Sequence, residues 1–200
     1  MGETIAIIVG AGRGHRFGGD LPKQYRTLGG VPVLRRTVSA FLSHPGIDAV
    51  RPVIHPDDEI LFRNAVAGLD VLDPVPGGAT RQDSVRLGLE SVETLAPSKI
   101  LIHDAARPFV AAEVITGVLD GLNAHTGAIP SLPVTDTLKR VSGGQIKGTV
   151  DRDELYRAQT PQGFRYGELM AAHRKAAGLA LTDDSAVAEH AGLDVVITPG

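Results

Sequence analysis

Residues 5–25, "IAIIVGAGRGHRFGGDLPKQY", contain the pattern that decides the fold. The five apolar residues 5–9 form a short continuous run, which is typical of a β-strand buried on both faces. A glycine-rich loop follows, and Arg13, Arg16 and Lys23 are spaced through it. Because backbone N–H groups in such a loop can cradle anionic oxygens, the stretch predicts an α/β sheet whose first loop binds phosphate. The alternative is a glycine turn with solvated surface cations.

Two familiar phosphate loops do not match this stretch. The dinucleotide fingerprint G-x-G-x-x-G needs a glycine at position 15, where the sequence has His15, and an acidic residue about 20 positions later, where residues 30–34 have none. The P-loop spacing fits Gly14 and Gly19, but Asp20-Leu21 follow instead of lysine and serine or threonine. The failed fingerprint and the missing acidic residue count against a nicotinamide-dependent dehydrogenase. What remains is a long open loop with the cations inside it.

Composition limits the class of protein. Two hundred residues suit one domain, and the net charge of −3 argues against a general nucleic-acid binder. The chain has no cysteine, so disulfides and thiolate metal sites are excluded. The run at 5–9 is too short for a signal-peptide core, and no stretch approaches the ~20 apolar residues of a membrane span. We expect a cytoplasmic protein that does not bind membranes.

Strand-like and helix-like segments alternate along the chain, which predicts a doubly wound, Rossmann-like α/β domain: a mostly parallel sheet with helices on both faces. The expected strands are residues 5–9, 49–54, 69–72, 100–102, 128–134 and 194–198. One expected helix has Pro32 in its first turn and continues to Leu42, and another follows the glycine turn at 77–78, with Val85, Leu89 and Val92 on one face. The other expected helices are residues 60–66, 114–122, 166–177 and 184–191. Pro52 lies within the second strand and indicates an edge position or a bulge there.

The alternation breaks at residues 135–151, "TDTLKRVSGGQIKGTVD". Alternating residues around Ser142-Gly143-Gly144 are typical of a β-hairpin. A hairpin has no place in a parallel central sheet, so we expect it to project as an arm. The sequence stops at Gly200, directly after a strand, whereas a doubly wound domain more naturally closes with a helix. We therefore expect a single domain over residues 1–200, with a truncated C-terminus.

Three further segments are candidates for a site. In "PGGATRQDSV", residues 76–85, glycines allow close approach and Ser84 opens a helix; the alternative is a tight turn with a helix cap. In "ILIHDAARPFV", residues 100–110, Asp104 ends a strand where ligands bind in α/β sheets, and it could hold Mg²⁺; the alternative is a turn-capping aspartate. His103 is expected to orient or pack rather than catalyse. In "LTDDSAV", residues 181–187, Thr182 is expected to cap a helix, with the next two aspartates favoured by its dipole.

The segments "GAGRGHRF…PKQY" and "HDAARP" resemble the cytidylyltransferases, and most closely the 2-C-methyl-D-erythritol 4-phosphate cytidylyltransferase family of the non-mevalonate isoprenoid pathway. The resemblance implies transfer of CMP from CTP to the alcohol phosphate, with release of pyrophosphate. It assigns catalysis to Arg16 and Lys23, and a metal-binding role, for Mg²⁺ or another divalent cation, to Asp104. The CTP-binding residues that it implies are Gly10, Ala11, Gly12, Gly14, Gly78, Arg81 and Ser84.

The same resemblance covers the second substrate and the assembly. It assigns the acceptor to Arg107, Thr137, Arg152 and Thr182, and it implies a homodimer in which the arm helps to complete the partner subunit's site. It also implies a substrate-contacting lysine beyond residue 200, and some family members are fused to a second enzyme of the pathway. The alternatives are a ribitol-5-phosphate (alditol-phosphate) cytidylyltransferase and, from another class, a dehydrogenase or a plain nucleotide-binding module. CTP itself is implied only by the resemblance.

Overall fold

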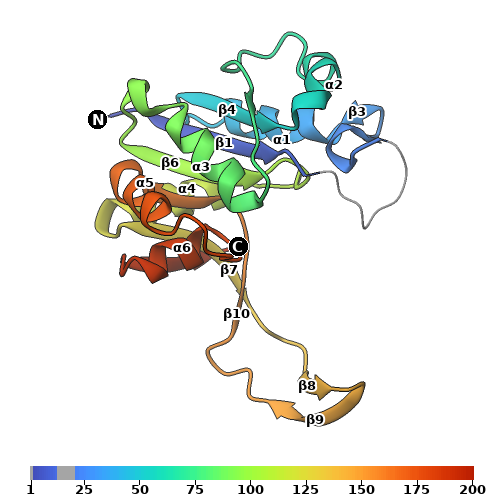
Figure 1. The fold of residues 1–200 in the computed structure, drawn as a ribbon, viewed down its shortest axis with the longest axis vertical. Coiled ribbons are helices and arrows are strands. Elements are labelled where there is room, and N and C mark those ends of the chain that lie inside the picture. Colours follow the sequence, from blue (N-terminus) through green and yellow to red (C-terminus); the bar gives the residue numbers. More distant parts are fainter. Residues whose placement is uncertain (1, 13–20) are drawn as a thin grey trace.

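The computed structural model describes residues 2–12 and 21–200, and its centre is an eight-stranded mixed sheet (Figure 1). The strand order is β10-β7-β11-β6-β1-β4-β5, and β12 also pairs with β7. Its strands are β1 (Thr4–Gly10), β4 (Ala49–Ile54), β5 (Val75–Pro76), β6 (Lys99–Asp104), β7 (Gly127–Pro133), β10 (Tyr156–Ala158), β11 (Gln162–Arg165) and β12 (Val195–Pro199). The predicted α/β fold is confirmed.

Strand β1 lies between β4 and β6 and runs parallel to both. At its carboxyl end Gly10 pairs with Ile54, and Val9 pairs with Asp104. The loops that follow these strands therefore meet at one edge of the sheet, where ligands bind in folds of this class. The sequence did not predict β11, which is antiparallel to both of its neighbours, β6 and β7.

Helices cover both faces of the sheet, as predicted (Figure 1). They are α1 (Val33–Leu42), α2 (Glu59–Ala65), α3 (Arg81–Glu90), α4 (Ala112–Ala124), α5 (Tyr166–Lys175) and α6 (Asp184–His190). Along β1, Ala6 and Ile8 join the core that contains α1 and α4, whereas Ile5 and Ile7 join the core that contains α3 and α5. Alternate residues of a strand face opposite sides, so a strand covered on both faces must be apolar throughout.

The predicted hairpin is present and projects from the body (Figure 1). Its strands, β8 (Leu138–Ser142) and β9 (Gln145–Val150), form a separate two-stranded sheet whose residues are nearly all exposed. Gly143 and Gly144 make the turn with φ values of +59° and +75°, which glycine adopts without the penalty a side chain would bring. A further small sheet joins β2 (Thr27–Leu28) to β3 (Val31–Pro32).

Two local predictions were wrong. Residues 69–72 are not a strand: the backbone runs beside β4, but only the Leu72 N–H donates to a β4 carbonyl, that of Val50, and the pairing with β4 falls at β5. The N-cap of α6 is Asp183 rather than Thr182, since the Asp183 carboxylate accepts from the Ala186 N–H at 3.0 Å. Pro52 lies in β4 directly before the two residues that pair with β5. Within the described ranges, β1 is therefore the only strand that pairs with β4 at Pro52.

No helix in the described ranges has both the length and the apolar character that crossing a lipid bilayer requires.

Candidate functional site

A cavity of about 700 Å³ opens at the carboxyl edge of β1 and β6. Several residues singled out in the sequence line it: Gly10, Ala11, Gly12, Lys23, Gly78, Arg81, Ser84 and Asp104. The structure thus brings together three segments that are far apart in the chain. Arg13, Gly14 and Arg16 lie outside the described residues, so this part of the first loop is not placed.

The first glycine segment, residues 10–12, is held by a residue that was not predicted from the sequence. Gln24 is buried, and its Nε2 donates to the Gly10 carbonyl at 2.7 Å. This bond fixes the end of β1 relative to the Lys23–Tyr25 turn, which contains the exposed Lys23. The signal available in the sequence was the position of Gln24 directly after that lysine.

The two glycine segments touch each other in the cavity wall. A Cβ built at Gly77 would lie 2.2 Å from the Cβ of Ala11, a distance that real Cβ atoms do not adopt. Glycine is therefore required at position 77 by close approach rather than by its φ angle. The next residue, Gly78, donates its N–H to the Ser84 hydroxyl at 3.1 Å.

Helix α3 begins at the cavity with a side-chain cap. The Thr80 hydroxyl accepts from the Asp83 N–H at 3.0 Å, and the Ser84 hydroxyl donates to the Thr80 carbonyl at 2.9 Å. The expected turn and cap are therefore present. They coexist with the ligand cavity, because Thr80 and Ser84 both line it.

Asp104, at the end of β6, faces two arginines. Its Oδ2 accepts from Arg107 Nε at 2.9 Å, and its Oδ1 lies 3.6 Å from Arg81 Nε. The Asp104 side chain remains one-third exposed toward the cavity. Mg²⁺ commonly binds through one or two carboxylates together with substrate phosphates, so this single carboxylate fits such an ion. Within residues 2–12 and 21–200, no cluster of three or more ligating side chains could hold a metal by itself.

His103 has the environment of a packing and orienting residue, as expected. Its ring is buried, its centroid lies 4.9 Å from that of Phe41, and its Nε2 donates to the Arg107 carbonyl at 2.9 Å. Burial lowers the pKa of His103 to about 4, so the ring is neutral at neutral pH. The bond to Arg107 fixes the turn that follows Asp104.

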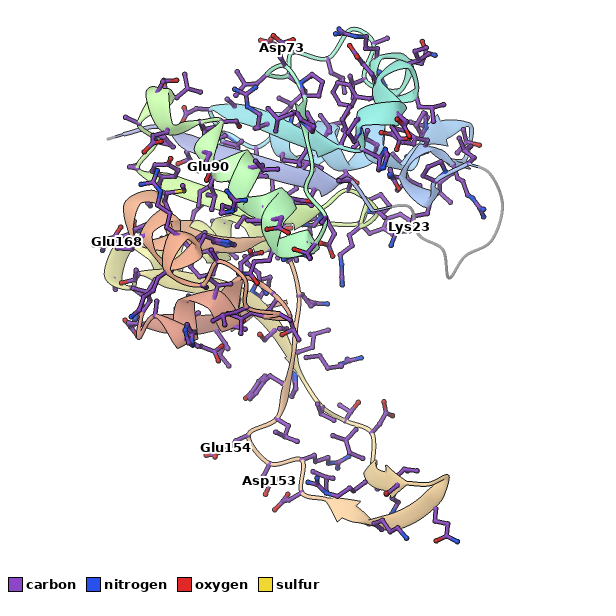
Figure 2. The ribbon with its side chains drawn as sticks, viewed as in Figure 1. Lys23, Asp73, Glu90, Asp153, Glu154 and Glu168 are labelled. Atoms are coloured by element: carbon purple, nitrogen blue, oxygen red, sulfur yellow. The ribbon has the colours of Figure 1, made fainter. Side chains whose placement is uncertain are left out.

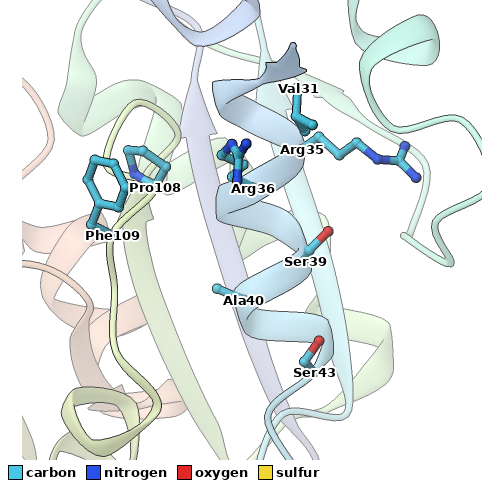
Figure 3. A pocket seen from close by; sticks show the side chains of 8 residues that line it. All are labelled: Val31, Arg35, Arg36, Ser39, Ala40, Ser43, Pro108 and Phe109. Atoms are coloured by element: carbon cyan, nitrogen blue, oxygen red, sulfur yellow. The ribbon is translucent and has the colours of Figure 1, made fainter. Parts of the chain in front are cut away.

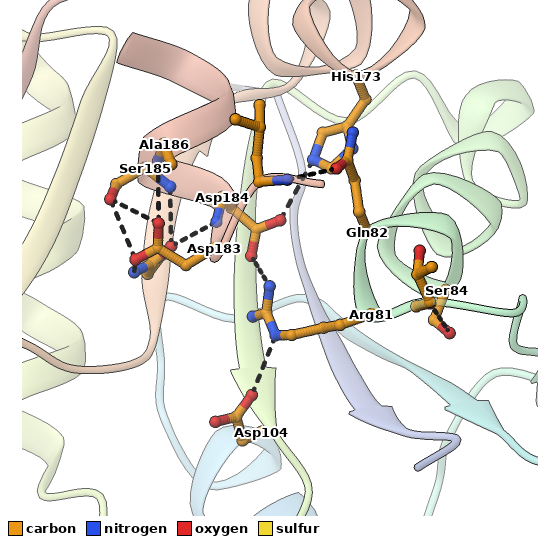
Figure 4. Close-up of polar contacts among 12 residues, drawn as sticks. Arg81, Gln82, Ser84, Asp104, His173, Asp183, Asp184, Ser185 and Ala186 are labelled. Atoms are coloured by element: carbon orange, nitrogen blue, oxygen red, sulfur yellow. Dashed lines mark hydrogen bonds and ion pairs between the residues drawn. The ribbon is translucent and has the colours of Figure 1, made fainter. Parts of the chain in front are cut away.

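A buried polar network, not predicted from the sequence, adjoins the cavity (Figure 4). Arg81 Nη1 donates to Asp184 Oδ2 at 2.8 Å, and His173 Nε2 lies 3.2 Å from Asp184 Oδ1. The Asp184 and His173 side chains are 1% and 0% exposed. The sequence signal was the second aspartate of "TDDSAV", which was assigned only to the helix dipole.

The acceptor residues that the resemblance implies are not gathered at this cavity. Thr182 is exposed, two residues before Asp184. Thr137 and Arg152 lie at the base of the arm, where the Arg152 guanidinium donates to the Thr135 carbonyl. Figure 2 shows Asp153 and Glu154, the neighbours of Arg152, on the arm and well away from Lys23.

A second, shallower hollow of about 410 Å³ lies between α1 and the segment after β6 (Figure 3). Its two arginines are engaged by backbone carbonyls: Arg36 donates to Leu28, and Arg35 donates to Ala65 and Ala67. None of the candidate site residues that the structure describes lines this hollow. The described residues expected to bind the nucleotide and the metal therefore lie at the larger cavity.

Comparisons with known proteins agree with this geometry. The family model for 2-C-methyl-D-erythritol 4-phosphate cytidylyltransferase matches residues 4–200. Curated relatives include the bifunctional enzymes IspD/IspF of Paramagnetospirillum magneticum and Rhodospirillum rubrum, each 58% identical over 100% of this chain and 52% of the relative. The chain thus spans about half the length of these curated relatives.

Solved structures give the same result. A crystal structure of 4-diphosphocytidyl-2C-methyl-D-erythritol synthase has a TM-score of 0.86 and 35% identity, and the cytidylyltransferase of Thermus thermophilus has a TM-score of 0.82 and 32% identity. Each alignment covers 100% of this chain and 89% of the other. The resemblance seen in the sequence motifs is confirmed: the chain belongs to the 2-C-methyl-D-erythritol 4-phosphate cytidylyltransferase family.

Proposed function

We propose that residues 1–200 act as one nucleotidyltransferase domain. The domain would transfer CMP from CTP to 2-C-methyl-D-erythritol 4-phosphate, giving 4-diphosphocytidyl-2-C-methyl-D-erythritol and pyrophosphate. The observation that carries the proposal is the single cavity that joins the first glycine segment, Lys23, the start of α3 and Asp104. Family membership supports the choice of CTP and of this acceptor. A reaction that consumes CTP in biosynthesis favours the cytoplasm as its location.

The reaction needs no general base. The nucleophile is an oxygen of a phosphate monoester whose second pKa is about 6, so it is already largely dianionic at neutral pH. A bond forms from this oxygen to the α-phosphorus of CTP while the bond to the β-phosphate breaks, and pyrophosphate leaves. His103 is unsuited to take a proton, because it is buried and its Nε2 donates to the Arg107 carbonyl.

The main obstacle is the repulsion between two polyanions. Lys23 lines the cavity and would offset the charge that builds on the α-phosphate and the leaving pyrophosphate, together with Arg16 of the same loop. Asp104 would hold the divalent cation, Mg²⁺ or another. When bound, such an ion neutralises phosphate charge and favours in-line geometry.

The nucleotide would be held by the cavity wall. Backbone N–H groups at Gly10, Ala11 and Gly12, continuing into Gly14, would meet the phosphates, since glycine-rich backbone at this position binds anions. The turn at Gly78 and the helix start at Ser84 would face the base and ribose, with Arg81 beside them. The support for this part is that all of these residues except Gly14, which is not described, line one cavity.

The binding site for the acceptor would be completed by a second subunit. Arg107 and Thr182 would contact the alcohol phosphate from one chain, whereas Thr137 and Arg152 would reach it from the arm of the partner in a homodimer. Support comes from the exposure of Val141 and Ile146 on the projecting arm, 55% and 66%, because large apolar side chains on an isolated hairpin favour burial against another surface.

The test is pyrophosphate release from CTP and Mg²⁺ with each candidate acceptor. We expect rapid release with 2-C-methyl-D-erythritol 4-phosphate and little with ribitol 5-phosphate. Preference for ribitol 5-phosphate would instead establish the alditol-phosphate cytidylyltransferase. If CTP binds but no pyrophosphate is released with either acceptor, the result would indicate a nucleotide-binding module without this activity.

A further inference from the structure

We propose that Asp184 is a positioning residue for the nucleotide end of the site. It anchors Arg81 and so prevents this arginine from closing on Asp104. This leaves Asp104 Oδ1 available to a divalent cation, beside Oδ2, which accepts from Arg107. The inference rests on the proposed function, since it assigns Asp104 to that cation. Asp184 itself would touch neither substrate.

The distances show an arginine shared unequally between two carboxylates. Arg81 Nη1 lies 2.8 Å from Asp184 Oδ2, a full hydrogen bond, whereas Arg81 Nε lies 3.6 Å from Asp104 Oδ1, an ion pair without hydrogen-bond geometry. A guanidinium can bind one carboxylate through two parallel hydrogen bonds. The anchor at Asp184 holds the guanidinium short of that arrangement with Asp104 (Figure 4).

The anchor is itself held by two contacts, and the helix that carries Arg81 is tied down separately. His173 contacts the second oxygen of Asp184 at 3.2 Å, and the Asp184 N–H donates to Gln162 Oε1 at 3.1 Å. Gln82, the neighbour of Arg81, donates to the Ala176 carbonyl at 2.9 Å and so ties α3 to the end of α5. The Asp184 carboxylate therefore has little freedom to follow Arg81 toward the cavity.

Stability alone is a weak reason for this arrangement. A buried ion pair often contributes no more than well-packed apolar residues of similar volume, because desolvation offsets the attraction. Here the pair joins α3 to α6, and its arginine lines the nucleotide cavity. The placement indicates a role in setting the cavity's charges.

The experiment is a mutant cycle with Asp184→Asn, Arg81→Ala and the double variant. Binding of Mn²⁺ in the presence of CTP is measured by electron paramagnetic resonance, beside the KM for CTP and for the alcohol phosphate. In Asp184→Asn we expect Mn²⁺ affinity to fall on the order of tenfold, because an arginine released from a charged hydrogen bond competes at Asp104. The double variant lacks the competing arginine, so its Mn²⁺ affinity should equal that of Arg81→Ala.

If Asp184 had a merely structural role, the loss of Mn²⁺ affinity in the double variant would be the sum of the losses in Asp184→Asn and Arg81→Ala. That additivity, or unchanged Mn²⁺ affinity in a folded Asp184→Asn, would overturn the inference. The matched control is Arg174→Gln. Arg174 lies on the same helix as His173, and its loss breaks only an exposed ion pair with Glu93, so Mn²⁺ binding should be unchanged.

His173→Ala provides the same test if Asp184→Asn does not fold. It removes one contact of Asp184 and should lower Mn²⁺ affinity by a smaller factor in the same direction, whereas unchanged affinity would count against the anchor. The wild-type assay separates the two proposals. The Mn²⁺ affinities of the variants could show the expected pattern while the wild type releases no pyrophosphate. That result would support the positioning role and reject the proposed reaction.

Discussion

The cavity rim and the β8–β9 arm differ in how their polar side chains are held. At the rim, polar groups are bonded across the fold: Gln24 reaches Gly10, and Arg81 reaches Asp184, 103 positions later in the chain. On the arm, the bonds are local and exposed, such as Lys139 Nζ to the Thr149 hydroxyl at 2.6 Å. The rim is therefore fixed by the core of one chain, whereas the arm has no core of its own.

This difference bears on what each region can do alone. Preorganised donors stabilise a transition state because they need no reorganisation during the reaction, and the rim meets that condition within one chain. An isolated two-stranded hairpin is marginal in water, so the arm would gain order only against another surface. The two regions thus make separable predictions about catalysis, stability and acceptor binding.

The largest expected effect is at the rim. We predict that Lys23→Ala lowers kcat by on the order of 10²–10³, the usual cost of removing one preorganised donor. Steady-state pyrophosphate release measures it. Lys175→Ala is the matched control, because Lys175 is exposed at the end of α5 and does not line the cavity. Near-wild-type turnover in Lys23→Ala would remove the role assigned to this residue.

Much of the rim could be predicted from the sequence because its signals are local. The apolar run at 5–9 required a strand covered on both faces, and "HDAARP" placed Asp104 at a strand end. The arm was found for the same reason, since Gly143-Gly144 allows the tight turn that a hairpin needs. Each of these features depends on a few neighbouring residues.

The buried network could not be predicted in this way. Asp184 reads as an ordinary helix-start acid, and its partners Arg81 and His173 are 103 and 11 positions away. Only the packing of α3, α5 and α6 brings the three together. The strand expected at 69–72 failed for a related reason, because an apolar run does not specify which part of it pairs with β4.

The second prediction concerns stability and again separates rim from arm. The folded state holds His103 neutral with its pKa lowered to about 4, whereas the unfolded chain binds a proton near pH 6.5. The unfolded state therefore binds more protons between these values, so stability falls as pH falls. Between pH 7.5 and 5 this group should cost about 2 kcal/mol of unfolding free energy.

Urea unfolding of the wild type and of His103→Gln, without divalent cations, measures that term. Glutamine keeps a donor toward the Arg107 carbonyl but does not titrate, so the wild type should lose about 2 kcal/mol more than the variant over this pH range. Lys139→Gln on the arm should change the pH dependence little, because its charge is exposed. Equal pH slopes in the wild type and His103→Gln would contradict the buried neutral ring.

The smallest expected effect tests whether the arm serves the acceptor rather than the nucleotide. Arg152→Ala should raise the KM for the alcohol phosphate on the order of tenfold, the scale of one charge-assisted hydrogen bond, and leave the KM for CTP nearly unchanged. Arg140→Ala, also on the exposed arm, is the matched control. A loss of CTP affinity in Arg152→Ala would mean that the arm reaches the nucleotide instead. Mixing Arg152→Ala with Lys23→Ala subunits sharpens the test. If each arm completes its partner's site, one site of each heterodimer contains both Lys23 and Arg152. The activity of the mixture should then exceed that of either variant alone.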